Sequence, residues 1–123
     1  KRFPEIASKR QSLAKHYDLL FEHHSQILPL VKDYETVVPH IYVVRIKGIK
    51  DRKELQTKLL ERGIQTGIHY QPNHWLSLYN KKKKDSLPVT EDVFPGLLTL
   101  PLHPDLSRKN VEFVSETLIS LMR

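Results

Sequence analysis

The residues best suited to chemistry gather in one stretch, residues 63–79, which reads GIQTGIHYQPNHWLSLY. It contains two of the seven histidines, His69 and His74, and the only tryptophan, Trp75. The alternation of apolar and polar residues before His69 predicts a strand that ends at His69 and Tyr70. Polar side chains at the end of a rigid element often form ligand contacts. We therefore take the segment from His69 to His74 as the candidate ligand contact.

The same histidines have a structural interpretation and a metal-binding one. Histidine and tryptophan near a strand end can simply cover the core, with their ring nitrogens bonded to backbone. A metal site is disfavoured, because His69 and His74 are five residues apart and would lie on opposite faces of a strand. The chain also has no cysteine and no His-x-x-x-His pair. We expect no metal ligands and, without a Gly-x-Ser-x-Gly turn or a phosphate-binding glycine loop, no catalytic nucleophile.

Hydrophobic periodicity predicts the elements that hold this segment. Residues 4–23 form an amphipathic helix whose apolar stripe is longer than so small a domain covers, so part of it would face a partner domain. Asp51 is expected to cap a second helix, with Glu54 as its capping-box partner. Further helices are expected at 87–93 and after Ser107. Strands are expected at 40–46, 64–70 and 97–102, with a short edge strand at 27–31.

The order strand, helix, strand across residues 40–70 is close to a βαβ unit in length. Gly67, inside the second of these strands, leaves room for another backbone or a ligand to approach. Together the elements predict an α/β (α+β) two-layer sandwich. Arg45 interrupts an apolar strand, and either reaches water at the strand end or binds a carboxylate.

Composition is that of one soluble globular domain. The 123 residues are 39% apolar and 28% charged, and no apolar run approaches the roughly 20 residues that span a bilayer. The absence of cysteine and of a signal-peptide pattern fits a reducing compartment, so we expect a cytoplasmic protein without membrane contact. The chain starts at Lys1 rather than at methionine, and we expect it to be part of a longer chain.

The net charge of +6 invites a nucleic-acid hypothesis. Residues 1–62 carry 13 Lys/Arg against 8 Asp/Glu, and residues 63–123 carry 7 against 6. The one dense run, Lys81 to Lys84, has no aromatic stacking pair or Gly-x-x-Gly loop beside it, which favours a solvated loop tip. We expect no specific nucleic-acid binding. A free-standing basic α/β module for nucleic acid or a sugar nucleotide stays as the alternative function.

Two ordered motifs carry a family resemblance. Residues 66–70 with Pro72, His74 and Tyr79, and then residues 100–106, resemble the C-terminal part of the DegT/DnrJ/EryC1/StrS aminotransferases. These are pyridoxal-phosphate sugar aminotransferases of the aspartate-aminotransferase fold (fold type I). The resemblance covers nearly the whole chain and is strongest to perosamine-synthetase-like members. It implies a single C-terminal small domain over 1–123, with an interdomain-type helix at 4–24 and a sandwich core at 40–123.

The resemblance implies a reaction, the transfer of an amino group from glutamate to a nucleotide-linked keto sugar, in amino-sugar, surface polysaccharide or O-antigen biosynthesis. It implies a homodimer and a pyridoxal phosphate that forms a Schiff base with a lysine of a preceding large domain. Nothing in this chain matches that lysine. We therefore expect the chain alone to bind no cofactor and to be inactive.

The resemblance also implies roles for His69, Tyr70 and His74. The matching family positions face the active-site cleft, where these side chains would hydrogen-bond the sugar or its phosphates, or help close the cleft. Gln71 and Asn73 stand where many relatives have apolar residues or proline, so the identity of the sugar stays open.

Overall fold

The computed structural model describes residues 2–30, 32–79 and 86–122. The four helices and three strands, in chain order, are α1 (Phe3–Phe21), β1 (Ile27–Pro29), β2 (Tyr42–Ile46), α2 (Arg52–Leu60), α3 (Pro88–Val93), β3 (Leu97–Leu100) and α4 (Arg108–Leu121). Two short 3₁₀ turns, η1 (Asn73–Trp75) and η2 (Phe94–Gly96), complete the described elements. No helix within these ranges combines the length and apolar character needed to cross a bilayer.

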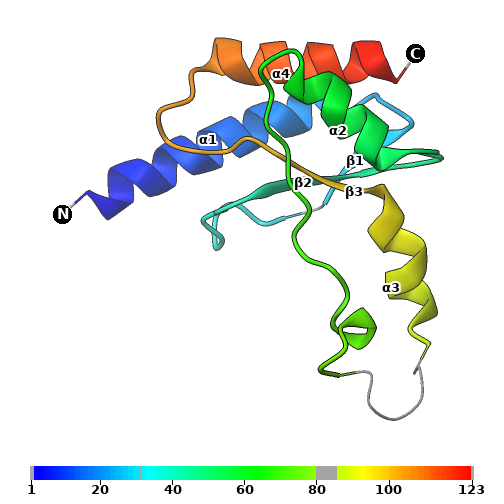
Figure 1. Ribbon diagram of the computed structural model, residues 1–123. Helices are drawn as coiled ribbons and strands as arrows, with labels where there is room; N and C mark the ends of the chain where they lie inside the picture. Colours follow the sequence, from blue (N-terminus) through cyan, green and yellow to red (C-terminus); the bar gives the residue numbers. More distant parts are fainter. Residues whose placement is uncertain (1, 31, 80–85, 123) are drawn as a thin grey trace.

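The sheet is antiparallel, with strand order β1-β2-β3. Because side chains alternate across a strand, Tyr42, Val44 and Ile46 face one side of β2 and Val43 and Arg45 the other. The first side carries the core, which α1, α2 and α4 cover (Figure 1). The predicted two-layer arrangement of helices on a sheet is therefore confirmed.

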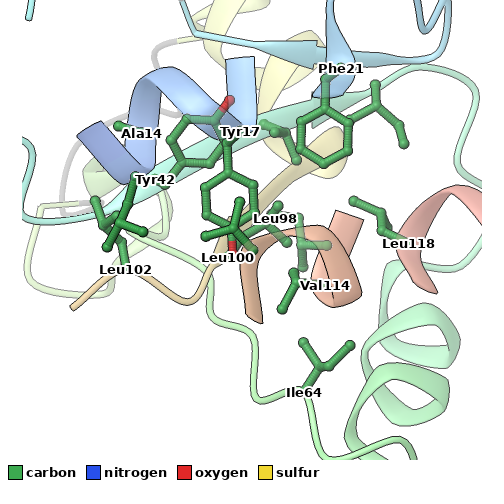
Figure 2. Packing of buried hydrophobic residues seen from close by; sticks show 14 of the residues in the cluster. Ala14, Tyr17, Phe21, Tyr42, Ile64, Leu98, Leu100, Leu102, Val114 and Leu118 are labelled. Atoms are coloured by element: carbon green, nitrogen blue, oxygen red, sulfur yellow. The ribbon is translucent and has the colours of Figure 1, made fainter. Parts of the chain in front are cut away.

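The core is built around the ring of Tyr17 in α1, which is fully buried (Figure 2). It stacks on Tyr42 of β2 with the ring centroids 4.5 Å apart. Its hydroxyl donates to the carbonyl of Pro101 at 3.0 Å, and burial raises the pKa of the phenol. Val114 and Leu118 close the cluster from α4. The core thus includes residues before position 40 as well as after it.

The N-terminal caps of α2 and α4 are the residues that the sequence predicts. Asp51 caps α2 by accepting a hydrogen bond from the backbone N–H of Glu54 at 2.9 Å. The Glu54 carboxylate does not close a capping box and instead lies 2.6 Å from Nζ of Lys58, one turn on. Ser107 caps α4, and there the Asn110 side chain completes the box. Both predicted caps are confirmed.

The predicted strand at 64–70 is wrong, and so is the βαβ unit that included it. Ile64 is buried directly after α2, but the segment pairs with the sheet only at Gly67, through one antiparallel bridge to Thr99. A glycine contributes no side chain to cross-strand packing, and Pro72 cannot donate to a ladder. Pairing therefore stops after one bridge, and the sheet contains no parallel pair among the described residues.

The remaining strands are shorter than predicted. β2 begins at Tyr42 rather than His40, and β3 ends at Leu100 because Pro101 follows. β1 covers Ile27–Pro29, and residue 31, the end of the predicted edge strand, lies outside the described residues.

Beyond Gly67 the described part of the chain leaves the sheet, and it is in the sheet again at β3 (Figure 1). We call residues 68–79 and 86–96 of this excursion the arm. The arm, which includes α3, projects from the side of the sheet opposite α1, α2 and α4, and only Pro72 and Gly96 in it are buried. Its exposed large apolar side chains are Tyr70, Trp75, Leu78, Tyr79, Leu87 and Val89. The predicted lysine loop, Lys81 to Lys84, lies outside the described residues.

The buried side of β3 gives a first test of the fold. Leu98 is 0% exposed, so we expect Leu98→Ala to lower the free energy of unfolding by about 2–5 kcal/mol through lost burial and a residual cavity. The matched control is Leu19→Ala in α1, where the leucine is 67% exposed and the change should stay within about 0.5 kcal/mol. Urea unfolding followed by circular dichroism measures both. Equal losses would mean that β3 does not face the core.

Candidate functional site

His69 lies beside the last strand of the sheet. The bridge that precedes it is closed by two backbone hydrogen bonds, from Gly67 N–H to the Thr99 carbonyl at 3.0 Å and from Thr99 N–H to the Gly67 carbonyl at 2.8 Å. The Thr99 side chain points to the face opposite the core, since Leu98 and Leu100 point into it. There the Thr99 hydroxyl lies 2.9 Å from Nδ1 of His69, whose ring is half-buried.

Tyr70 follows His69 and is open to solvent. Its side chain is 74% exposed, and its ring meets the His69 ring edge-on with the centroids 5.0 Å apart. The peptide bond between the two residues is cis. An imidazole and a phenol therefore stand side by side at the point where the arm leaves the sheet, where both can offer hydrogen bonds to a ligand.

His74 holds the two limbs of the arm together. It lies in η1, its side chain is 15% exposed, and its Nε2 lies 3.0 Å from Oε1 of Glu91 in α3. The same Glu91 carboxylate accepts a hydrogen bond from the backbone N–H of Leu87 at 3.2 Å. The Leu87 N–H bond, and after it the His74 bond, hold the pKa of Glu91 below its ordinary value. The His74 ring, which the sequence predicts as a ligand contact, thus also has a structural partner in Glu91.

An aromatic contact lies at the base of the arm. The Trp75 ring meets the Phe94 ring edge-on, with the centroids 5.3 Å apart. The guanidinium of Arg52 in α2 lies 4.6 Å from the centre of the Phe94 ring and donates to the backbone carbonyls of Phe94 and Leu97. These contacts connect η1 and η2 of the arm with α2.

Arg45 forms an ion pair within the chain. Its guanidinium lies 2.8 Å from the Asp92 carboxylate of α3, on the same side of the sheet as the arm. Arg45 is therefore a carboxylate-binding arginine, as the second of the two sequence interpretations had it, but its partner is internal. The ion pair adds a second connection between the sheet and α3.

The structure brings His69 and Tyr70 together but places His74 with α3. Among the described residues, no hydrogen bond or ring contact joins His74 to His69 or Tyr70, and no three acidic or histidine side chains converge on a metal position. Sequence reasoning missed Thr99 and the role of Glu91. Thr99 carried a signal, because it is the one polar residue of β3.

The described residues do not fit a pyridoxal-phosphate site. The described lysines are exposed, except for the half-buried Lys32, whose Nζ lies near the backbone carbonyl of Ile41. A Schiff-base lysine needs a desolvated pocket or a cationic neighbour that lowers its pKa. No described lysine lies in such a pocket.

Glu91 makes the arm sensitive to acid. Because its pKa is lowered on folding, the carboxylate stabilises the arm above the ordinary pKa of 4.5, and this stabilisation is lost as the pH falls through the lower folded pKa. We expect the fluorescence of Trp75, which adjoins His74, to change in that acid range. In Glu91→Gln the arm should already be loosened at neutral pH, so the acid step should disappear.

Glu112→Gln is the matched control for this titration. It removes the same charge from another His–Glu pair, with His16 at 3.1 Å, away from the arm. Circular dichroism recorded beside the fluorescence separates loosening of the arm from unfolding of the domain. The same acid step in Glu91→Gln and Glu112→Gln would show that Glu91 does not hold the arm.

The chain is similar to known aminotransferases in sequence. The model of the DegT/DnrJ/EryC1/StrS aminotransferase family matches residues 1–119. A dTDP-3-amino-3,6-dideoxy-alpha-D-galactopyranose transaminase of Aneurinibacillus thermoaerophilus is 35% identical over 109 residues, which cover 88% of this chain and 29% of that protein.

Solved structures agree in fold. Helicobacter pylori PseC, an aminotransferase involved in the biosynthesis of pseudoaminic acid, matches 98% of this chain and 33% of its own, with a TM-score of 0.87 and 25% identity. The PLP-form of the sugar aminotransferase Spr1654 of Streptococcus pneumoniae matches 98% of this chain and 32% of its own, with a TM-score of 0.87 and 29% identity. The chain spans about a third of the length of these relatives. It belongs to the DegT/DnrJ/EryC1/StrS aminotransferase family.

Proposed function

We propose that this chain is the C-terminal small domain of a pyridoxal-phosphate-dependent aminotransferase that moves an amino group from glutamate to a nucleotide-linked keto sugar. Family membership and relatives that are nucleotide-sugar transaminases support this proposal. The observation that carries it is the pair His69 and Tyr70, which are fixed at the edge of the sheet and open to a ligand. A homodimer in the cytoplasm is part of the same proposal.

The cofactor would be held by the other two-thirds of the full-length protein. When bound there, pyridoxal phosphate supplies the carrier for the amino group. The contribution of this chain is to bind and orient the sugar substrate. Its described lysines are exposed, apart from the half-buried Lys32, and this supports a division in which another part of the protein links the cofactor.

The three candidate residues would contribute differently. Nδ1 of His69 is bonded to Thr99, which leaves Nε2 to donate to or accept from a sugar hydroxyl or a phosphate oxygen. The hydroxyl of Tyr70 can do the same from a more exposed position. His74 has its Nε2 engaged with Glu91, so only Nδ1 is left for substrate, and its first contribution is the shape of the arm.

His69→Ala in the full-length enzyme tests the proposed function. The variant loses one hydrogen bond to substrate, which costs about 0.5–1.5 kcal/mol, or up to about 3 kcal/mol if the partner is charged. We expect kcat/KM for the sugar to fall by about a few-fold to about a hundredfold. The half-reaction with glutamate and the amount of bound cofactor should be nearly unchanged, because the proposed role of His69 is a contact with the sugar and not with glutamate or the cofactor.

Stopped-flow measurement of each half-reaction, beside a thermal melt, gives the answer. His23→Ala is the matched control, because the His23 side chain is 93% exposed in the loop after α1 and should change neither half-reaction. Equal loss in both half-reactions of His69→Ala, or a collapsed melt, would make His69 a cofactor or core residue and refute the substrate role.

The 123-residue chain alone should bind pyridoxal phosphate no better than an unrelated basic protein does. The reason is that no described lysine lies in a desolvated pocket, where a Schiff-base lysine is usually activated. The measurement is borohydride trapping followed by peptide mass mapping, with a basic protein of similar size as control. A single lysine labelled stoichiometrically would contradict the division of roles between the two parts of the enzyme.

A further inference from the structure

Thr99 is an unusual residue for its place in the fold. It is 6% exposed, it lies in the middle of an otherwise leucine-built strand, and its hydroxyl points away from the core. A buried hydroxyl without a hydrogen bond costs free energy, so its partner matters. That partner is Nδ1 of His69, 30 residues earlier in the chain.

The backbone fixes both partners of this contact. Thr99 pairs with Val43 of β2 on one side and with Gly67 on the other. His69 is two residues after Gly67, and a diagonal neighbour across an antiparallel pair is within reach of a long side chain. The β-branched threonine has few χ1 rotamers, so its hydroxyl has few alternative positions.

Gly67 supplies the space in which the His69 ring lies. A Cβ at position 67 would be 2.6 Å from Cε1 of His69, too close without movement of the ring, and 3.2 Å from its Nδ1, which is a tight contact. The conflict is with the far end of a side chain and not with backbone. A side chain at position 67 would therefore displace the ring. The backbone bridge between residue 67 and Thr99 could still form, because no backbone atom is in conflict.

We propose that Thr99 and Gly67 are positioning residues that hold the His69 imidazole so that Nε2 faces the sugar substrate. The proposal rests on the proposed function of His69. The Thr99 hydroxyl can donate to Nδ1 in one neutral tautomer and accept from it in the other, so this contact acts on the orientation of the ring and not on its tautomer. The hydrogen bond opposes ring flips, and Gly67 lets the ring lie close enough to be held.

The first test observes the ring without any reaction. In the 123-residue chain, two-bond ¹H–¹⁵N correlation spectra of the ring report the surroundings of both His69 ring nitrogens. Thr99→Val keeps the side-chain shape but removes the hydroxyl, and should shift or broaden the Nδ1 signal because that nitrogen loses its hydrogen bond and the ring its fixed orientation. Thr99→Ser should restore the wild-type signals. Gly67→Ala should displace the ring by an independent route, and Thr117→Val, at a buried threonine of α4, is the matched control.

The second test uses the full-length enzyme. Thr99→Val and Gly67→Ala should each lower kcat/KM for the sugar by about threefold to about thirtyfold, as expected for a misplaced hydrogen-bonding group. Thr99→Ser should recover most of the loss. Neither change should lower activity further when His69→Ala is already present, because both act through the His69 ring.

The outcomes separate this proposal from the proposed function. Unchanged His69 signals in both Thr99→Val and Gly67→Ala would overturn the positioning role, whatever His69→Ala does to turnover. Changed signals in a protein whose His69→Ala variant keeps full sugar activity would support the positioning and refute the substrate role of His69. An added loss from Thr99→Val in the His69→Ala background would overturn the claim that Thr99 acts through His69.

Discussion

The buried ring of Tyr17 is the contact on which the fold depends, because it joins three distant parts of the chain. It belongs to α1, stacks on Tyr42 of β2 and donates its hydroxyl to the carbonyl of Pro101, just after β3. A phenol tip inside a core must find an acceptor, so this hydrogen bond restricts where the segment after β3 can lie. The hydrogen bond to Pro101 therefore holds the carboxyl end of β3 next to α1.

The site follows from the register of β3. With Leu98 and Leu100 in the core, Thr99 must face the other side, where the Gly67 bridge and the His69 ring meet it. The same side holds Arg45 and its partner Asp92. One side of the sheet therefore carries the apolar core, while the other side carries polar groups that include the proposed ligand contacts.

Much of the fold could be predicted from local sequence. The apolar face of α4 and the caps at Asp51 and Ser107 depend on residues within one or two turns, and such patterns are readable. The absence of a strand at 64–70 could not be predicted locally. Alternation of apolar and polar residues is typical of a strand, but it does not show whether a neighbouring strand is there to pair with.

The candidate site was predictable only in part for the same reason. The residue types at His69 and Tyr70 pointed to a ligand contact, and the two motifs pointed to the family. The partners Thr99 and Glu91 lie 30 and 17 residues from the histidines they bind. No periodicity connects residues at such separations, so their contacts emerge only when the sheet and arm are folded.

The arm begins and ends on the same small part of the sheet. Gly67 pairs opposite Thr99, and β3 starts at Leu97, two residues earlier, or about 7 Å along a strand. An excursion whose ends are anchored this close together can lengthen, shorten or change composition at a small entropic cost and without shifting the strand register. Evolution, or a protein engineer who builds chimeras, can therefore replace the arm by another segment while α1, α2, α4 and the sheet keep their packing.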